Sequence, residues 1–356
     1  MLVQLPVLFA NNFVPKFIFS FDWREMKEVF FLSLPRTLTV SASHLTILVL
    51  TALASLMAEG SITVFNLSFN LQSVPLTVIG LSYTIAAFPT LARLFSSGEK
   101  NEFVAQIISA TRHIVFWSFP VLVLFIVLRA QIVRTVLGSG AFGWTETRLT
   151  AAALALFSVS IVAQSLILLF VRGYYAAGFT KKPLIINLFS SALIVGLAFL
   201  FVSVFQANDF FRYFVESLLR VSDTEGTVIL MLPLAFSLGT LVNLFLLWFV
   251  FIRDFSGTLE SAALEKEYTA LSLTSGHSFS ASVIAGFAAF QALRVFDDVF
   301  DINTFWGIFA QGFFSGALGV IAWLLILVVL NNQELKEIVR AIPHRFWRHV
   351  RPVAPD

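Results

Sequence analysis

Cysteine and charged side chains are what this sequence has least of. None of its 356 residues is cysteine, which excludes disulfides, Cys-ligated zinc and thiol catalysis. Lys, Arg, Asp and Glu together make up 12%, about half the share in a typical soluble domain. Such a chain cannot cover a folded surface with polar groups, so soluble enzymes, disordered chains, collagens and coiled coils are excluded. The net charge of +2 is too small and too dispersed to indicate a nucleic-acid partner.

Long apolar stretches dominate what is present. Apolar residues make up 58% of the chain, and 41 of them are phenylalanine. A hydrocarbon core of roughly 30 Å needs about 20 mostly apolar residues as helix, and eight such stretches occur, without the two-residue alternation of a barrel. The sequence therefore predicts an all-α, polytopic membrane protein with about eight transmembrane helices. They lie near residues 29–57, 62–94, 103–128, 149–175, 183–206, 227–252, 277–296 and 303–331.

The basic residues are unevenly divided between the two sides of these helices. Sixteen of the 23 Lys and Arg fall in the connections and tail on one side and six on the other, while Arg36 lies within the first stretch. Because cytoplasmic connections carry the excess of Lys and Arg, both termini are predicted to be cytoplasmic. The tail at 332–356 mixes Arg with Phe346 and Trp347, so it is either an anchor on the anionic inner leaflet or an ordinary basic tail.

Polar residues line one side of the first predicted helix. Arg36, Thr39, Ser43 and His44 share a face at helical spacing, and we call them the first polar row. An ionisable residue inside a span is costly and therefore a functional candidate. Arg36 either faces a cavity or extends to the inner headgroups, and His44 is either a packing residue or a proton carrier.

A second polar row lies on the next predicted helix. Its members, Thr63, Asn66, Asn70, Ser73 and Thr77, recur at intervals of three or four, on either side of Pro75. This stretch is too long for one straight crossing, and Pro75 favours a kink that frees a backbone carbonyl. The row either joins helices or lines an aqueous path. Facing each other, the two rows would suit an anionic substrate that bears sugar or phosphate, since Arg binds phosphate in a bidentate way.

One motif favours an enzyme. Asp297, Asp298 and Asp301 match the DDxxD pattern with which prenyl-transferring enzymes hold magnesium and pyrophosphate. Such enzymes need a second acidic cluster, which the sequence lacks, and Arg294 one turn earlier would neutralise the first. An acidic outer connection is the better interpretation. We predict no catalytic residue, no metal site and no cofactor, because no Gly-rich phosphate loop, Ser/His/Asp set or His-rich spacing occurs.

Three segments, in order and at matching spacing, resemble the MurJ/MviN family of lipid II flippases in the MOP exporter superfamily. The first is AEGSITVFNLSFNLQSVPLTVIGLSYTIAAFPTLARL at 58–94, similar to the family's eighth helix. The second is LFVRGYYAAGFTKKPLIINL at 169–188, similar to its turn between helices ten and eleven. The third, at 2–35, resembles the end of the sixth helix, the lobe linker and the start of the seventh. The resemblance covers most of residues 1–200 and assigns structural turn and kink roles to Pro75, Arg172, Gly178 and Pro183.

The family has fourteen helices, in two six-helix lobes around a cavity and a final pair that flanks a groove. The resemblance implies that this chain holds helices seven to fourteen and lacks the N-terminal lobe, so that a missing lobe or a second copy is expected as partner. The implied regions are the end of a preceding helix and linker at 1–28, a six-helix lobe at 29–252, a connector with a surface helix at 253–276, the final pair at 277–331 and the basic tail at 332–356.

The resemblance also implies a function. The family moves an undecaprenyl-pyrophosphate-linked peptidoglycan precursor across the bacterial cytoplasmic membrane, and basic cavity residues hold the pyrophosphate. We expect both polar rows to bind this lipid-linked oligosaccharide. Two departures stand out: Asn70 replaces a cavity arginine of many members, and Leu50 replaces an acid that some use for sodium coupling. The alternatives are another MOP exporter, for polysaccharide-linked lipids or drugs, a polyprenyl-pyrophosphate enzyme, and a non-transporting half that pairs with a separate lobe.

Overall fold

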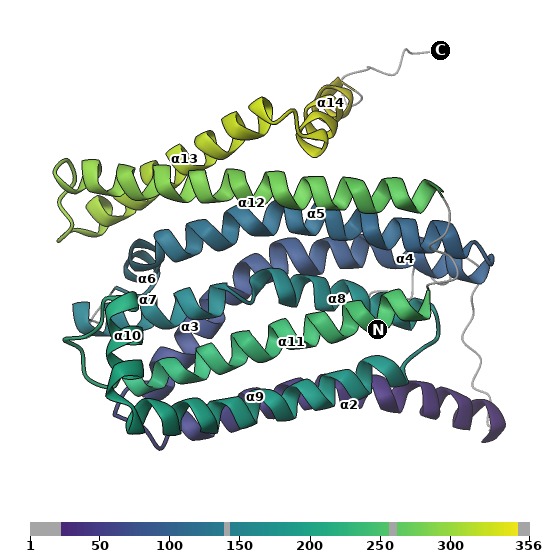
Figure 1. Ribbon diagram of the computed structural model, residues 1–356, viewed down its shortest axis with the longest axis horizontal. Helices are drawn as coiled ribbons and strands as arrows, with labels where there is room; N and C mark the ends of the chain where they lie inside the picture. The colour runs from purple at the N-terminus through teal and green to yellow at the C-terminus, as the bar shows by residue number, and fades with distance from the viewer. Residues whose placement is uncertain (1–22, 139–142, 256–261, 348–356) are drawn as a thin grey trace, which may run out of the picture.

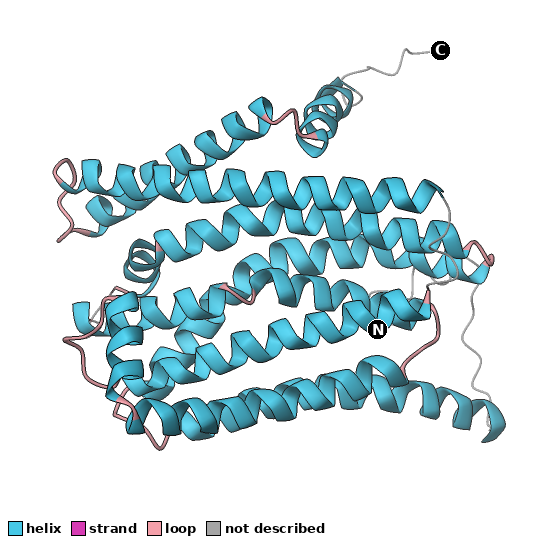
Figure 2. Ribbon diagram, in the orientation of Figure 1, coloured by secondary structure: helices cyan, strands magenta, loops and turns pink. Residues whose placement is uncertain are grey.

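The computed structural model describes residues 23–138, 143–255 and 262–347, and in these ranges every regular element is a helix (Figure 2). The helices are α2 Trp23–Ala54, α3 Ser61–Pro75, α4 Ser82–Ser96, α5 Lys100–Val127, α6 Arg129–Leu137, α7 Trp144–Ser158, α8 Ile161–Ala176, α9 Lys181–Ala207, α10 Asp209–Leu219, α11 Met231–Asp254, α12 Ala262–Asp297, α13 Phe305–Val329 and α14 Gln333–Trp347. The predicted all-α architecture is confirmed. The predicted end of a preceding helix at 1–22 lies outside the described residues.

The predicted spans are also confirmed. Seven helices in the described ranges are long and apolar enough to cross a membrane, and α7 and α8, bent by 43°, make an eighth as a pair. Successive spans run in opposite directions, so their connections collect at two ends of the bundle (Figure 1). We call the end with the α4–α5 and α8–α9 connections and α14 the basic end, and the other, with α6 and α10, the far end. Lysines and arginines at the basic end include Arg93, Lys100, Lys181, Lys182, Lys336 and Arg340.

Two buried clusters hold the first six spans together. Near the far end, Phe65 and Phe157 pack edge to face with ring centroids 5.5 Å apart, in a core shared by α3, α7, α9 and α11. Nearer the basic end, Phe103, Phe170 and Phe251 lie in a second core of α4, α5, α8 and α11. Aromatic pairs in such geometry stabilise a core beyond the apolar area they bury.

The α12–α13 hairpin packs along α5, and a row of small residues on α12 is buried among these helices, with Ala285 and Ala289 next to Gly319 of α13. Ser278, Ala281, Ala285 and Ala289 are fully buried at intervals of three or four. Small residues let helix backbones approach closely in a membrane, where dispersion and hydrogen bonds replace the hydrophobic effect. Ser278 Oγ accordingly donates to a backbone carbonyl of α5, that of Phe116, at 2.9 Å.

The structure differs from the sequence-based expectation at the start of α12, and it gives the form that the chain takes after Pro75. The surface helix expected in 253–276 is not separate: from Ala262 on, these residues are the first turns of α12, which continues to Asp297 without a break. The reason is that residues 262–275 contain neither Pro nor Gly, and a helix of 36 residues outreaches the bilayer. After Pro75, the chain continues as a π-helical turn, Leu76–Leu81, before α4.

That turn brings α3–α4 very close to α8. A Cβ atom built at Gly80 would lie 2.8 Å from the Cα of Ser165, so only glycine fits at this crossing. The absence of a side chain at Gly80 therefore allows the span Ser61–Ser96 to pack closely on α8, the second half of the bent α7–α8 pair, which we call the broken span.

Candidate functional site

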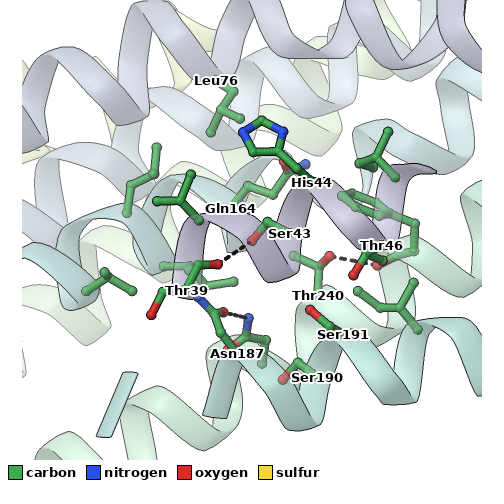
Figure 3. Close-up of a pocket in the computed structure, with 18 of the residues that line it drawn as sticks. Thr39, Ser43, His44, Thr46, Leu76, Gln164, Asn187, Ser190, Ser191 and Thr240 are labelled. Atoms are coloured by element: carbon green, nitrogen blue, oxygen red, sulfur yellow. Dashed lines mark hydrogen bonds between the residues drawn. The ribbon is translucent and has the colours of Figure 1, made fainter. Parts of the chain in front are cut away.

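A cavity of about 410 Å³ opens between α2, α8, α9 and α11, with Phe69 of α3 and Leu76 beside them. We call it the lobe cavity. Its polar lining comes from four helices, and the labelled side chains converge on one space (Figure 3). The polar residues of the lining are Arg36, Thr39, Ser43, His44, Thr46, Gln164, Arg172, Tyr175, Asn187, Ser190, Ser191, Thr240 and Asn243.

The whole first polar row lines this cavity. Its hydroxyl groups are satisfied within α2, since Thr39 Oγ1 donates to the Pro35 carbonyl at 2.8 Å and Ser43 Oγ to the Thr39 carbonyl at 3.4 Å. Thr39 is buried, whereas Arg36, Ser43 and His44 remain exposed. These three side chains are therefore available to a ligand.

Arg36, on α2, is a positively charged residue of the cavity wall. It is the fourth residue of the span Ser33–Ala54, about 4.5 Å along the axis from the span's first residue. Its guanidinium carbon lies 5.5 Å from the ring centroid of Tyr175, a cation–π contact. Among the described residues, no carboxylate lies within ion-pair distance of it. A positive charge that is held by a ring and not neutralised is suited to an anion.

The amides of Gln164, Asn187 and Asn243 line the cavity, and no sequence pattern singles them out. Asn243 Nδ2 of α11 donates to Asn187 Oδ1 of α9 at 2.6 Å, and both side chains are buried. Gln164 of α8 donates to Gln72 Oε1 of α3 at 2.9 Å. The signal that could have found them is the rule for the first row: a polar side chain within an apolar span needs a partner or a role.

Three polar atoms of the lining have no hydrogen-bond partner within the described part of the chain. These are Tyr175 Oη, Ser190 Oγ and Asn243 Oδ1, which are all buried. A buried polar atom without a partner is costly, by about 1–3 kcal/mol. The lining therefore offers unused hydrogen-bonding capacity next to an unpaired arginine.

The second polar row does not line the lobe cavity, so the structure does not bring the two rows together there. Phe69 and Leu76 face the cavity from this span instead. Asn70 and Thr77 are exposed on another face, and Asn66 and Ser73 are half-buried. Substrate binding by the second row stays a prediction.

Three of the four residues with predicted turn and kink roles, Pro75, Gly178 and Pro183, lie at breaks or ends of helices, whereas Arg172 lies within α8. Pro75 ends α3, where the π-helical turn begins. Gly178 has φ +76° in the α8–α9 turn, a conformation that favours glycine. Pro183 is the third residue of α9, where a backbone N–H has no partner within the helix. Arg172, near the end of α8, also lines the lobe cavity.

Two of the three DDxxD aspartates, Asp297 and Asp301, accept hydrogen bonds at the far end. Asp301 Oδ1 accepts from the backbone N–H of Asn303 at 2.9 Å, and Asp297 Oδ1 accepts from Gln311 Nε2 at 3.3 Å. Arg294 does not neutralise them as expected: its guanidinium lies over the Phe290 ring, 4.7 Å from the centroid. In the residues that the structure describes, no three His, Cys, Asp or Glu side chains are grouped so as to hold a metal ion.

A bidentate ion pair joins two segments at the far end. Arg148 of α7 donates to both carboxylate oxygens of Asp223, at 2.7 and 2.6 Å. These hydrogen bonds hold the pKa of Asp223 below its usual range. The pair ties the broken span to the connection between α10 and α11.

Comparison with known proteins gives one consistent family. A family model described as lipid II flippase MurJ matches residues 1–210. Proteins described as probable lipid II flippase MurJ from Rhizobium tropici and Thermotoga maritima are 28% identical over 159 residues and 26% identical over 275 residues. These alignments cover 45% and 70% of this chain. They cover 30% and 57% of the relatives, so the chain spans about a third to just over half the length of these proteins.

A solved structure gives the same result for the fold. The structure titled "Lipid II flippase MurJ, inward closed conformation" superposes with a TM-score of 0.60, at 15% identity. The superposition covers 95% of this chain and 61% of the other chain. Nearly all of this chain therefore shares the fold of part of that transporter.

Proposed function

Because this chain belongs to the lipid II flippase MurJ family, whose model matches more than half of it, we propose that it works in lipid II transport. The cargo would be a peptidoglycan precursor linked to undecaprenyl pyrophosphate, moved across the bacterial cytoplasmic membrane, with both termini of this chain on the cytoplasmic side. The observation that carries the proposal is an unpaired arginine in a lobe cavity whose other polar groups are neutral or basic.

Arg36 is the residue proposed to bind the pyrophosphate. Hydrogen bonds between a guanidinium and a phosphate are charge-assisted and can be bidentate. The Tyr175 ring contacts the face of the Arg36 guanidinium, so the N–H groups at the edge of the guanidinium can still donate to a ligand. The position of Arg36 one turn into the span, at the basic end, suits the capture of a headgroup from the cytoplasmic leaflet.

The neutral part of the lining suits the rest of the headgroup. Ser43, Ser191 and the amides of Asn187 and Asn243 can donate to and accept from sugar hydroxyls and peptide groups. This chemistry also fits a polysaccharide-linked lipid, the second candidate cargo. Cationic drugs fit less well, because no carboxylate is among the residues that line the lobe cavity.

We further propose that a second lobe, in this protein or in a partner, covers the exposed polar faces of α2 and α3. His44 and Asn70 are exposed within spans, where lipid would be a poor solvent for them. Two facing lobes would turn these surfaces into the walls of a shared central path. The second polar row would then meet the cargo without lining the lobe cavity.

Complementation tests this proposal. The full-length locus that carries this chain should restore growth to a bacterium depleted of its own lipid II flippase. Arg36→Ala should weaken pyrophosphate binding by about 1.5–3 kcal/mol, or about 10- to 150-fold, and should reduce rescue, while Arg36→Lys should retain part of it. Arg212→Ala, at the far end, is the matched control and should rescue fully.

Two results would count against the proposal. Full rescue by Arg36→Ala would remove the role of this residue. Failure of the unaltered locus to rescue, with the protein present in the membrane at normal amount, would remove lipid II as the cargo. Rescue of a strain that lacks a polysaccharide-lipid flippase would then favour the second candidate.

A further inference from the structure

The connection between α13 and α14 forms an elbow toward the basic end (Figure 1). This elbow holds a second pocket of about 260 Å³. Its basic lining residues are Lys336 and Arg340, one turn apart on α14. Val328 and Val339 also line it and are 65% and 57% exposed. From this geometry we infer that the elbow pocket binds the headgroup of an anionic phospholipid, with an acyl chain along the exposed valines.

The two cations of the pocket are free to bind an anion. Within the described ranges, neither Lys336 nor Arg340 has a carboxylate within 4.0 Å. The acids of α14 lie nearer to Arg112, because Glu334 is buried against it at 2.8 Å and Glu337, although 56% exposed, lies 4.0 Å from it. The helix thus separates its charges, with acids toward the protein and bases toward the pocket.

The first turn of α14 is held firmly, so the pocket exists before a ligand arrives. Glu334 is 1% exposed, and its Oε1 lies 2.8 Å from Arg112 Nε of α5 and accepts from Thr274 Oγ1 of α12 at 2.7 Å. Asn332 Oδ1 caps the turn by accepting from the Leu335 N–H at 3.1 Å. Asn331 takes the left-handed conformation, φ +55°, that forms the elbow. Preorganised donors lose less entropy when they bind.

The pocket also contains a donor that the protein leaves unused. Asn332 is 2% exposed, and its Nδ2 group is buried without a hydrogen-bond partner in the part of the chain that the structure describes. Because a buried donor favours an acceptor, a phosphate oxygen at this place would satisfy it.

A membrane lipid fits this pocket better than a soluble anion does. The pocket follows directly on the span Phe305–Val329, so it lies at the level where headgroups meet the acyl region. Four of the eight lining residues are apolar, and two of these, Val328 and Val339, are exposed surface that a soluble phosphate would leave uncovered. A basic cluster beside an apolar surface at the cytoplasmic face is the pattern of anionic-lipid recognition.

Native mass spectrometry of the full chain, released from detergent micelles, tests the site. Titration with dioleoyl-phosphatidylglycerol should give a saturable bound lipid, and dioleoyl-phosphatidylcholine should bind much more weakly. The double variant Lys336→Gln/Arg340→Gln should weaken phosphatidylglycerol binding about thirty-fold, since each basic group near a membrane surface contributes about fivefold. Lys336→Arg/Arg340→Lys, which keeps both charges, should bind like the unaltered chain.

The matched control removes two lysines that are exposed at the same end but outside the elbow. Lys100→Gln/Lys181→Gln should change binding less than about twofold, because neither residue lines the pocket. An equal loss in both double variants would overturn the proposal, since binding would then follow net charge alone. Displacement of the lipid by excess inorganic phosphate would also overturn it, in favour of a soluble-anion site. If the Gln variant fails to fold, equal affinity of the unaltered chain for the two lipids decides against the proposal.

Discussion

Removing Glu334 should release α14 from the bundle. Its carboxylate compensates Arg112, whose side chain is only 10% exposed, and removing one partner of a buried ion pair costs about 3–5 kcal/mol. Glu267 and Glu337 remain within 3.6 and 4.0 Å of the guanidinium, so we expect the lower limit for Glu334→Ala, about 3 kcal/mol. This corresponds to an opening equilibrium of α14 that is about 150-fold more favourable.

Hydrogen exchange followed by mass spectrometry measures this opening locally. Backbone amides in the first turns of α14 should exchange about 150-fold faster in Glu334→Ala, while those in the spans stay protected. Glu337→Ala is the control: its side chain is 56% exposed, so exchange should rise less than about fivefold. The double variant Arg112→Met/Glu334→Leu should recover most of the protection, because no charge is left unpaired. Unchanged exchange in Glu334→Ala, or no recovery in the double variant, would refute the reasoning.

Three further predictions concern the spans and the far end. Gly80→Ala should lower the free energy of unfolding by about 1–3 kcal/mol in detergent, because its Cβ would press against α8. Asn243→Ala should cost about 1–3 kcal/mol in the same assay, because Asn187 Oδ1 would lose its donor while buried. Asp223 has a pKa lowered by Arg148, so the stability that this pair contributes is present at neutral pH and is lost as the pH falls through that depressed pKa; a pH series of the thermal midpoint measures it.

Each of these has a control in the chain. Gly196→Ala should be neutral or slightly stabilising, since a Cβ there meets nothing within 4 Å; a loss equal to that of Gly80→Ala would show that helix propensity or expression is responsible. Asn187→Ala/Asn243→Ala should be less costly than the sum of the single changes, and strict additivity would mean that the amides do not interact. Asp223→Asn should flatten the acid limb of the pH series, and an unchanged limb would assign it to other carboxylates.

The sequence was sufficient for the spans and for the first polar row, and the reason is physical. Twenty apolar residues have one stable arrangement in lipid, and an arginine near the start of such a run marks a face that spacing alone can extend to Thr39, Ser43 and His44. The buried amides were missed because a single Asn187 or Asn243 in its own helix carries no periodicity. Only tertiary packing shows that these two meet.

The start of α12 was misjudged for the opposite reason. Its charged stretch has the composition of a surface helix, and composition does not tell whether a helix stops before the membrane or runs on into it. Helix-breaking residues decide where a helix ends, and residues 262–275 contain neither proline nor glycine. The first glycine, Gly276, lies within α12 and does not interrupt it. The orientation of the whole bundle rests on charge counts in the same way and stays a prediction.

The second polar row shows which kind of surroundings this face of α3 requires, because an exposed polar group needs hydrogen-bond partners. Ser73 and Thr77 make no such demand, because their hydroxyls donate to carbonyls of their own helix at 2.7 and 2.9 Å. Asn70 differs: its side chain is exposed, and no described group bonds to it. Its amide would leave four hydrogen-bonding positions unpaired against hydrocarbon, at a cost of several kcal/mol. Water or another protein surface satisfies those positions and lipid does not, so this single amide favours an aqueous path or a facing lobe along α3.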